Sequence, residues 1–328
     1  MRWVCCVIVV GLAIVVGCDK GPATPGAGGG AGFRVAMILP GSDTDKGWNQ
    51  MAREGLDRIR NELGAETKLV TNVKSSEFAG QIDYFAEGYG VIICHGGEFA
   101  QAVEQAVKKH PDVKFIVGGC PTEIAGAVPV EFLARDASFL VGVVAGNVTK
   151  TKSVAFVGAM AVPTLEACYT GMRDGALSFS GDLTVLPPLW TNSWDSPPLA
   201  KEKAESAINN GNADVVFQNV DAAARGVFEA VKEATARGKT VYAFGCNSNQ
   251  NDIAPDVILG SVVLDVQRAY TELAREAKAG TLKPGARKLG LDGGWVDLVL
   301  NERHPVVTSA IQESVAAARG KLVGDSKK

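Results

Sequence analysis

The chain has 328 residues, of which 46% are apolar and 21% charged, and its formal net charge is −3 at pH 7. This length and apolar content suffice for about two domains of roughly 150 residues each. Lysine and arginine are scattered and form no basic stripe, so nucleic acid is not an expected partner. The composition leaves a small or neutral molecule as the expected partner.

The first 17 residues are typical of an export signal. Arg2 precedes an almost unbroken apolar run, Trp3–Val16, which is too short to span a bilayer and has the length of a secretory h-region. The tetrapeptide Val15-Val16-Gly17-Cys18 resembles a bacterial lipobox, whose cysteine becomes the acylated N-terminus. We therefore expect a lipoprotein anchored through Cys18; an uncleaved anchor would give the same topology.

Residues 18–32 are dominated by glycine, alanine and proline. Such a segment cannot build a core, so it is predicted to be a flexible tether, with the folded part beginning near Phe33. Asp19 resembles an inner-membrane retention signal of lipoproteins. The expected location is the bacterial cell membrane, on its periplasmic or outer face.

From Phe33 onward, short apolar runs bounded by turn residues alternate with amphipathic helices. The helix expected at Phe99–Lys109, for example, places its apolar residues at i, i+3 and i+4. This alternation predicts an α/β fold with parallel sheets and crossover helices. The expected strands are Arg34–Leu39, Thr67–Thr71, Val91–Cys94, Lys114–Val117, Pro129–Phe132, Ser153–Val157, Leu183–Leu186, Ala213–Gln218, Thr240–Gly245, Ile258–Leu264 and Val296–Leu300.

These expected strands are more than a single open sheet normally contains. The alternation of strands and helices also starts again after the long helix expected at Ala137–Thr149. Composition breaks at Asn247–Asp252 and Ala279–Pro284 indicate further passages between two lobes. We expect two doubly wound, Rossmann-like lobes joined by a three-segment hinge. The expected crossings lie near Ala134, Asn249 and Leu282, which gives a first lobe of residues 33–133 and 250–281 and a second lobe of residues 134–249 and 282–328.

Four of the seven cysteines lie within the expected folded part, namely Cys94, Cys120, Cys168 and Cys246. Their positions do not have metal-ligand spacing, so neither a metal nor a cofactor is expected. Cys94 and Cys120 both follow apolar runs, and a disulfide between them is conceivable in an exported protein. Buried free thiols are the favoured expectation for both.

The segment Ser42–Gln50, after the first expected strand, carries two acids, an indole and amides. Ligands of wound α/β sheets lie at the carboxyl ends of strands. We therefore assign Asp43, Asp45, Trp48 and Asn49 to the first wall of a binding cleft. The alternative is a solvated turn in which Asp45 caps the helix and Trp48 enters the core.

Further candidates follow other expected strands. His95 and Phe99 flank a glycine pair that opens a helix, where a ligand can approach backbone amides; core packing is the alternative for both. Trp194 and Asp195 precede a helix in the second lobe, and Asp221 lies just after another strand. For these, packing of the indole beneath its loop and helix capping by the acids remain open.

Five ordered motifs resemble the basic membrane protein family of bacterial lipoproteins. They are Asp45–Gln50, His95–Phe99, Phe139–Gly146, Ser193–Asp195 and Ala213–Gln218, and the resemblance covers roughly Phe33 to Lys321. It implies the type I periplasmic-binding-protein fold and a substrate-binding subunit of an ABC importer. Several family members bind purine nucleosides or related compounds. The implied partners are a small ligand and the permease and ATPase subunits, and we expect a monomer.

The resemblance also implies roles for the candidate residues. Trp48 would stack on a planar base, Asp45 and Asn49 would contact its edge, and Trp194 would oppose it from the second lobe.

Two departures from the nucleoside-binding pattern concern the sugar. Asn247, Ser248 and Asn249 stand where many relatives carry an acid that holds the ribose, and Leu264 follows Ser261 where they carry a lysine. We keep Asn247 and Asn249 as candidate ligand contacts. A free purine base becomes nearly as plausible as a nucleoside.

Catalysis is not expected. No Gly-x-Gly-x-x-Gly follows the first strand, and no Ser/His/Asp or Cys/His order is supported by its context. Two alternatives remain: a binding protein for a sugar or another small polar nutrient, and a ligand receptor that feeds a sensor kinase.

Overall fold

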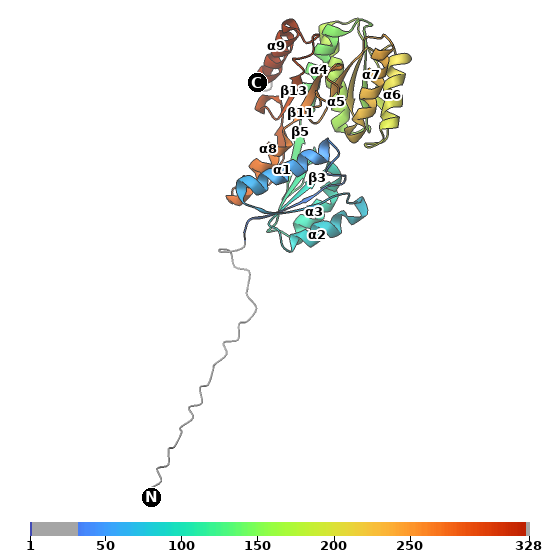
Figure 1. Ribbon diagram of the computed structural model, residues 1–328. Helices are drawn as coiled ribbons and strands as arrows, with labels where there is room; N and C mark the ends of the chain where they lie inside the picture. Colours follow the sequence, from blue (N-terminus) through green and yellow to red (C-terminus); the bar gives the residue numbers. More distant parts are fainter. Residues whose placement is uncertain (2–31, 326–328) are drawn as a thin grey trace. The chain divides into compact units, whose positions relative to one another are not determined.

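The computed structural model describes Met1 and residues 32–325 (Figure 1). The expected signal peptide, the tether and the lipid attachment site at Cys18 lie outside these residues. Among the described residues, no helix is both long and apolar enough to span a bilayer.

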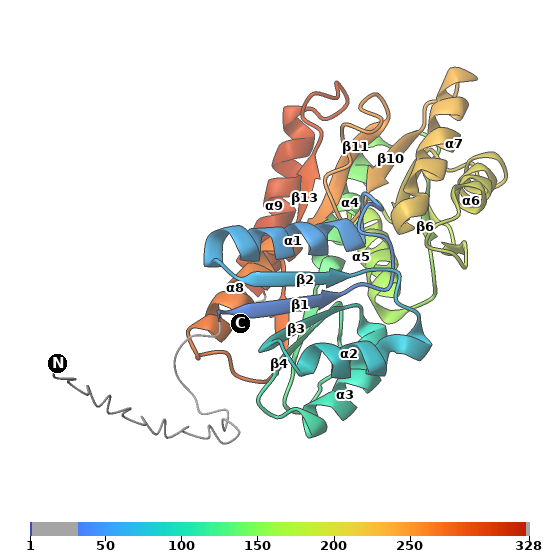
Figure 2. The same cartoon turned by 60° about the horizontal axis from the view of Figure 1, so that its bottom comes forward.

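The first sheet is wholly parallel, with the strand order β12-β5-β4-β3-β1-β2. Its central strands are buried and apolar because helices cover both faces. Helices α1 (Trp48–Leu63) and α8 (Val266–Lys278) cover one face, and α2 (Phe78–Ala86) and α3 (Ala100–Lys109) cover the other (Figure 2). The strands are β1 (Arg34–Ile38), β2 (Glu66–Val70), β3 (Val91–His95), β4 (Lys114–Gly118), β5 (Val128–Phe132) and β12 (Arg287–Leu289).

The second sheet has the order β13-β11-β10-β9-β6-β7, with β8 also paired to β6, and only its β11–β13 pair is antiparallel. Helices α4 (Ala134–Val148), α5 (Pro163–Phe179) and α9 (Ser309–Asp325) pack on one face, and α6 (Pro197–Asn209) and α7 (Ala224–Ala236) on the other. The strands are β6 (Ser153–Gly158), β7 (Thr184–Val185), β8 (Leu189–Trp190), β9 (Val215–Asn219), β10 (Tyr242–Gly245), β11 (Ile258–Leu264) and β13 (Val296–Leu300). We call the two sheets with their helices the first and second lobes.

Within residues 32–325 the chain passes between the lobes after β5, after β11 and after β12. Strand pairing corrects two expected crossings. The crossing expected near Asn249 occurs at Asp265, because β11 pairs with β10 and β13 in the second lobe. The crossing expected near Leu282 occurs after Leu289, because β12 pairs with β5. The polar break near Asn249 is a loop at the edge of the second sheet, not a linker.

Each expected strand is present, with bounds that differ by at most two residues. The sequence did not predict β8 and β12. Both are very short, and β12 consists of Arg287, Lys288 and Leu289, so neither forms an apolar run.

Helices α4 and α5 approach each other closely because glycines lie at their interface. A Cβ on Gly142 would lie 2.1 Å from the Met172 carbonyl oxygen, and one on Gly175 would lie 2.0 Å from the Phe139 carbonyl oxygen. The motif Phe139–Gly146 therefore serves helix packing, not ligand contact.

Replacing Gly142 with alanine should destabilise the protein by about 1–3 kcal/mol, because the added methyl group forces two packed helices apart. Thermal unfolding of the purified variant measures this loss. Gly80→Ala in α2 is the matched control, since a Cβ there meets no atom within 4 Å. The control should be neutral or gain up to about 1 kcal/mol. Equal melting temperatures for the two variants would contradict the proposed packing.

Candidate functional site

The N-terminus of helix α1 lies where the carboxyl ends of strands from both lobes meet. The backbone N–H of Trp48 donates to Asp221 Oδ1 of the second lobe at 2.8 Å. The hydroxyl of Ser248, also in the second lobe, donates to the Lys46 carbonyl oxygen at 3.4 Å. These two hydrogen bonds hold the lobes together at the candidate site.

Asp45 holds the start of α1 from within the first lobe. Its Oδ1 accepts from the backbone N–H groups of Gly47 (2.8 Å) and Gln50 (3.0 Å). Its Oδ2 accepts from the backbone N–H and the side-chain amide of Asn49, at 2.9 and 2.8 Å. A carboxylate has about four lone-pair positions, so Asp45 is fully used as a cap. The observed contacts of Asp45 are those of the helix-capping alternative.

The indole of Trp48 is held by groups of its own lobe. It stacks on the His95 ring, with centroids 3.9 Å apart, and meets Phe132 edge-on at 6.1 Å. Gly119 has φ +65°, and a Cβ there would lie 2.8 Å from Trp48 Cζ2. Only a glycine therefore fits at the end of β4 beside the indole. His95 covers one face of the indole, so a planar ligand has only the other face to stack on.

His95 is fully buried and supports Trp48 instead of facing the cleft. Its Nε2 lies 2.9 Å from the Trp48 carbonyl oxygen, and its Nδ1 lies 2.5 Å from the Tyr270 hydroxyl of α8. Burial lowers the pKa of His95 to about 3, so the ring is neutral. A neutral ring that donates from Nε2 must accept the Tyr270 proton at Nδ1.

Asp221 is the acidic residue of the second lobe at the contact. Burial, and then the negative charge of Asp45, raise its pKa to about 7, while its hydrogen bonds with Trp48 and Asn247 oppose the shift. Asp221 has φ +52°, an uncommon conformation for a residue with a side chain. Asn247, after the neighbouring strand, has φ +72° and is buried. Such strain is concentrated at functional sites, and here the two strained residues interact through their side chains.

The other second-lobe candidates lie at the surface. Trp194 is 41% exposed, and its carbonyl oxygen accepts from the Ala223 N–H at 3.1 Å, which ties its loop to the start of α7. Asp195 is exposed and accepts from the Ser193 hydroxyl at 2.9 Å.

The remaining candidates do not converge with Trp48. Phe99 is fully buried and stacks on Phe78 at 3.7 Å, so its assignment as a ligand contact is corrected to a core residue beneath α2 and α3. The Asp43 carbonyl oxygen accepts from Arg53 Nε at 3.3 Å. Asn249 is exposed, and its side chain accepts from the Asn251 N–H at 3.1 Å.

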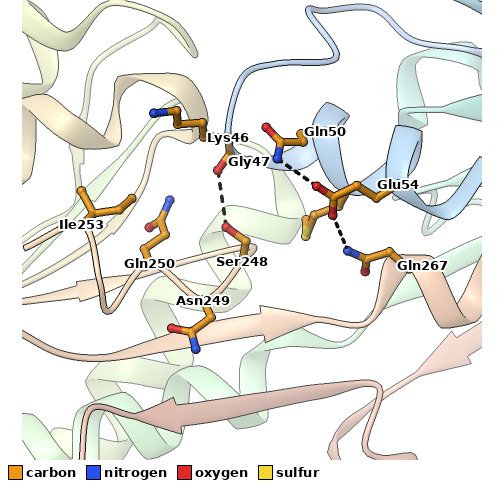
Figure 3. A pocket seen from close by; sticks show the side chains of 10 residues that line it. Lys46, Gly47, Gln50, Glu54, Ser248, Asn249, Gln250, Ile253 and Gln267 are labelled. Carbon is orange, nitrogen blue, oxygen red and sulfur yellow. Dashed lines mark hydrogen bonds between the residues drawn. The ribbon is translucent and has the colours of Figure 1, made fainter. Parts of the chain in front are cut away.

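A polar cavity of about 280 Å³ lies along α1 between the lobes (Figure 3). Glu54 accepts there from the side-chain amides of Gln50 and Gln267, at 2.9 and 3.0 Å. Gln50 is two residues from Trp48, roughly on the opposite side of the helix. The cavity therefore lies apart from the indole. Its lining residues are Lys46, Gly47, Gln50, Met51, Glu54, Ser248, Asn249, Gln250, Ile253 and Gln267.

Sequence reasoning missed Gly119, Tyr270 and the glutamines of the cavity. The pair Gly118-Gly119, directly after an apolar run, is the signal that could have marked a close approach at a strand end. Tyr270 carries no such signal, because it occupies an ordinary buried position of an amphipathic helix.

Residues 33–325 match the model of the Bmp family, described as "ABC transporter substrate-binding protein PnrA-like". The CD4+ T-cell-stimulating antigen of Listeria monocytogenes is 28% identical over 320 residues, covering 90% of this chain and 87% of that protein. Basic membrane protein A of Borreliella burgdorferi is 23% identical over 297 residues, covering 88% of this chain and 85% of that protein.

Solved structures share the fold. A solute-binding protein of an ABC transporter system from Aeropyrum pernix K1 has a TM-score of 0.79 at 21% identity, covering 90% of this chain and 92% of that chain. A transcriptional activator of the comK gene from Bacillus halodurans has a TM-score of 0.75 at 22% identity, covering 88% and 97%. These likenesses confirm the expected α/β fold of the type I periplasmic-binding-protein class.

The raised pKa of Asp221 predicts that the contact between the lobes is proton-linked. Its pKa of about 7, against an ordinary 3.8, means that the folded protein holds this proton more tightly than the unfolded chain. Stability from this group is therefore greatest below about pH 4 and falls as the pH rises towards 7, by at most about 1.4 kcal/mol per pH unit.

Asp221→Asn keeps an acceptor for the Trp48 N–H but cannot ionise. Its melting temperature relative to wild type should rise between pH 5 and pH 8, as measured by thermal unfolding at intervals across that range. A difference that is constant with pH would mean that Asp221 is ionised throughout.

Proposed function

Because the chain belongs to the Bmp family of PnrA-like ABC transporter substrate-binding proteins, we propose that it captures a purine nucleoside or a free purine base between its lobes for an ABC importer. The observation that carries the proposal is the fixed indole of Trp48. It lies at the carboxyl ends of the first-lobe strands, and an exposed indole, Trp194, lies in a strand-end loop of the second lobe. Ligands of wound α/β sheets bind at such strand ends.

The way in which its neighbours hold the indole of Trp48 favours stacking of that indole on a flat ring of the ligand. The indole is fixed by His95, Phe132 and Gly119, so little rotamer freedom is lost when a ligand binds. Aromatic stacking adds about 0.5–1.5 kcal/mol beyond the burial of area. Closure would bring Trp194 onto the opposite face of the ligand.

Asn49 offers a polar contact for the edge of the ligand. The residue is 7% exposed, and its Oδ1 is buried with no hydrogen-bond partner, while its amide nitrogen binds Asp45. A buried acceptor left unpaired costs about 1–3 kcal/mol. An N–H or amino group on a purine edge would satisfy it. Asp221, with a pKa of about 7, can donate or accept at the contact between the lobes.

By the same proposal, the protein is held at the membrane by acylation of Cys18 and works as a monomer with a permease and an ATPase. The family description is that of a binding protein and not of an enzyme.

A polar ligand such as a sugar is the second candidate. The cavity beside α1 favours it, because amides and a hydroxyl line much of its wall and none of the aromatic candidates does. A thermal-shift panel of nucleosides, free purines and sugars separates the two candidates, since a ligand at 100 times its Kd adds about 2.7 kcal/mol of stability.

Replacing Trp194 with alanine should weaken purine binding by about 1–3 kcal/mol, which is about 5- to 150-fold in Kd. Its melting temperature should stay near that of wild type, because the side chain is already 41% exposed. Titration calorimetry measures the affinity. Tyr84→Ala is the matched control, since this aromatic is 69% exposed on α2 and should leave the affinity unchanged. An unchanged Kd in Trp194→Ala would remove the second wall of the proposed site.

A nucleoside should bind no more than about tenfold more tightly than its free base, because the sugar gains only about one neutral hydrogen bond of net value. Calorimetry of guanosine against guanine, inosine against hypoxanthine and adenosine against adenine checks this. A preference above about a thousandfold, or roughly 4 kcal/mol, would mean that Asn247, Asn249 or Asp221 holds the ribose.

A further inference from the structure

Two buried thiols of the second lobe, those of Cys168 and Cys246, lie in the same hydrophobic cluster. Cys168 lies on α5 and is 1% exposed, and Cys246 directly follows β10 and is 3% exposed. A side-chain interaction between the two thiols is the leading influence on the pKa of each. The strand register gives independent support. Phe244 of β10 pairs with Phe217 of β9, which brings Cys246 beside Asn219, and the Asn219 side chain donates to Cys168 Sγ at 3.7 Å.

The surroundings of Cys168 are unusually polar for a buried position. Ser138 of α4 is fully buried, and its hydroxyl has no hydrogen-bond partner of ordinary geometry, although it faces the Cys168 sulfur. Hydrogen bonds from Cys246, and then from Ser138 and Asn219, lower the pKa of Cys168 against the effect of burial. The bond to Cys168 and burial raise the pKa of Cys246. Cys168 is therefore the better nucleophile of the pair.

We propose that Cys168 and Cys246 form a disulfide in the exported protein, through exchange with an oxidised thiol oxidoreductase or a small disulfide while the chain folds. Substrate-binding proteins of importers work outside the cytoplasm, where disulfides persist. A disulfide requires the two sulfurs to approach to a bond length of about 2.05 Å, and both thiols already lie in the same buried cluster.

The exchange balances in two steps. The Cys168 thiolate attacks one sulfur of the oxidant, and the oxidant's second sulfur leaves as a thiolate that takes up the proton lost from Cys168. The Cys246 thiolate then attacks the Cys168 sulfur of the mixed disulfide, and the second oxidant thiol leaves with the proton of Cys246. The protein loses two hydrogen atoms, and the oxidant gains them.

Cys94 and Cys120, the pair that the sequence makes conceivable, are not brought together in this way. Both are buried and free, as Cys168 and Cys246 also are in this structure. Cys94 aligns with Val117 in the β3–β4 register, and the Cys120 thiol donates to the Thr122 carbonyl oxygen at 3.4 Å. They provide an internal comparison for the proposed pair.

The test uses the purified full chain, refolded in a glutathione redox buffer, alkylated under denaturing conditions and mapped by peptide mass spectrometry. Cys168 and Cys246 should escape alkylation and appear as one cross-linked peptide pair, with Cys94 and Cys120 alkylated. Alkylation of both Cys168 and Cys246, a link from either of them to another cysteine, or separate glutathione adducts on the two would overturn the proposal. This mapping needs no variant and no ligand, so its failure is distinct from failure of the proposed function.

Variants add a second readout. Oxidation should raise the melting temperature of wild type and of Cys94→Ala, because the link closes the long loop between residues 168 and 246 in the unfolded chain. Cys168→Ala should show no such rise, and its Cys246 should be alkylated. An equal rise in Cys168→Ala would contradict the pairing.

Discussion

The hydrogen bond from the Trp48 N–H to Asp221 joins the two lobes at the point where their strands end. It gives helix α1 two caps, one from Asp45 in its own lobe and one from the other lobe. A Cβ on Gly47 would lie 2.1 Å from Asp221 Oδ1, so glycine is required for the carboxyl group to approach this closely. The contact between the lobes thus forms at the same helix start that positions the indole. The raised pKa of Asp221 reflects first its burial and then the nearby negative charge of Asp45.

The indole itself depends on a chain of neutral groups. The Trp48 carbonyl oxygen can only accept, so it fixes the tautomer of His95 with the proton on Nε2, and Nδ1 accepts from the Tyr270 hydroxyl. The His95 ring in turn stacks on the indole of Trp48. Since burial keeps His95 uncharged, this support does not change over the pH range in which Asp221 titrates. The stacking surface and the contact between the lobes therefore respond to pH separately, although both involve Trp48.

Sequence alone predicted the strands well, because parallel strands buried on both faces must be continuous apolar runs. It misplaced two crossings between the lobes for two reasons. A polar segment can be any exposed loop, so the break near Asn249 was mistaken for a crossing. Strand β12 is short and carries two charged residues, so the sequence did not reveal that the chain stays in the first lobe up to Leu289. At the site, Trp48 could be predicted from its place after β1. The roles of His95 and Phe99 could not be predicted in the same way. Whether such a side chain is buried or faces a cleft depends on neighbours distant in sequence, such as Tyr270 for His95. The cavity between α1 and the loop at Ser248 needed the contact between the lobes, which no local pattern encodes.

At the end of β9 and again after β10, one residue interacts with Cys168 and a nearby residue takes part in the contact between the lobes. On β9, Asn219 bonds Cys168 beneath the sheet, and two residues later Asp221 bonds the first lobe. After β10, Cys246 meets Cys168, and the next residue, Asn247, bonds Asp221. The Cys168 side chain thus interacts with residues at both strand ends, within two residues of the contact between the lobes.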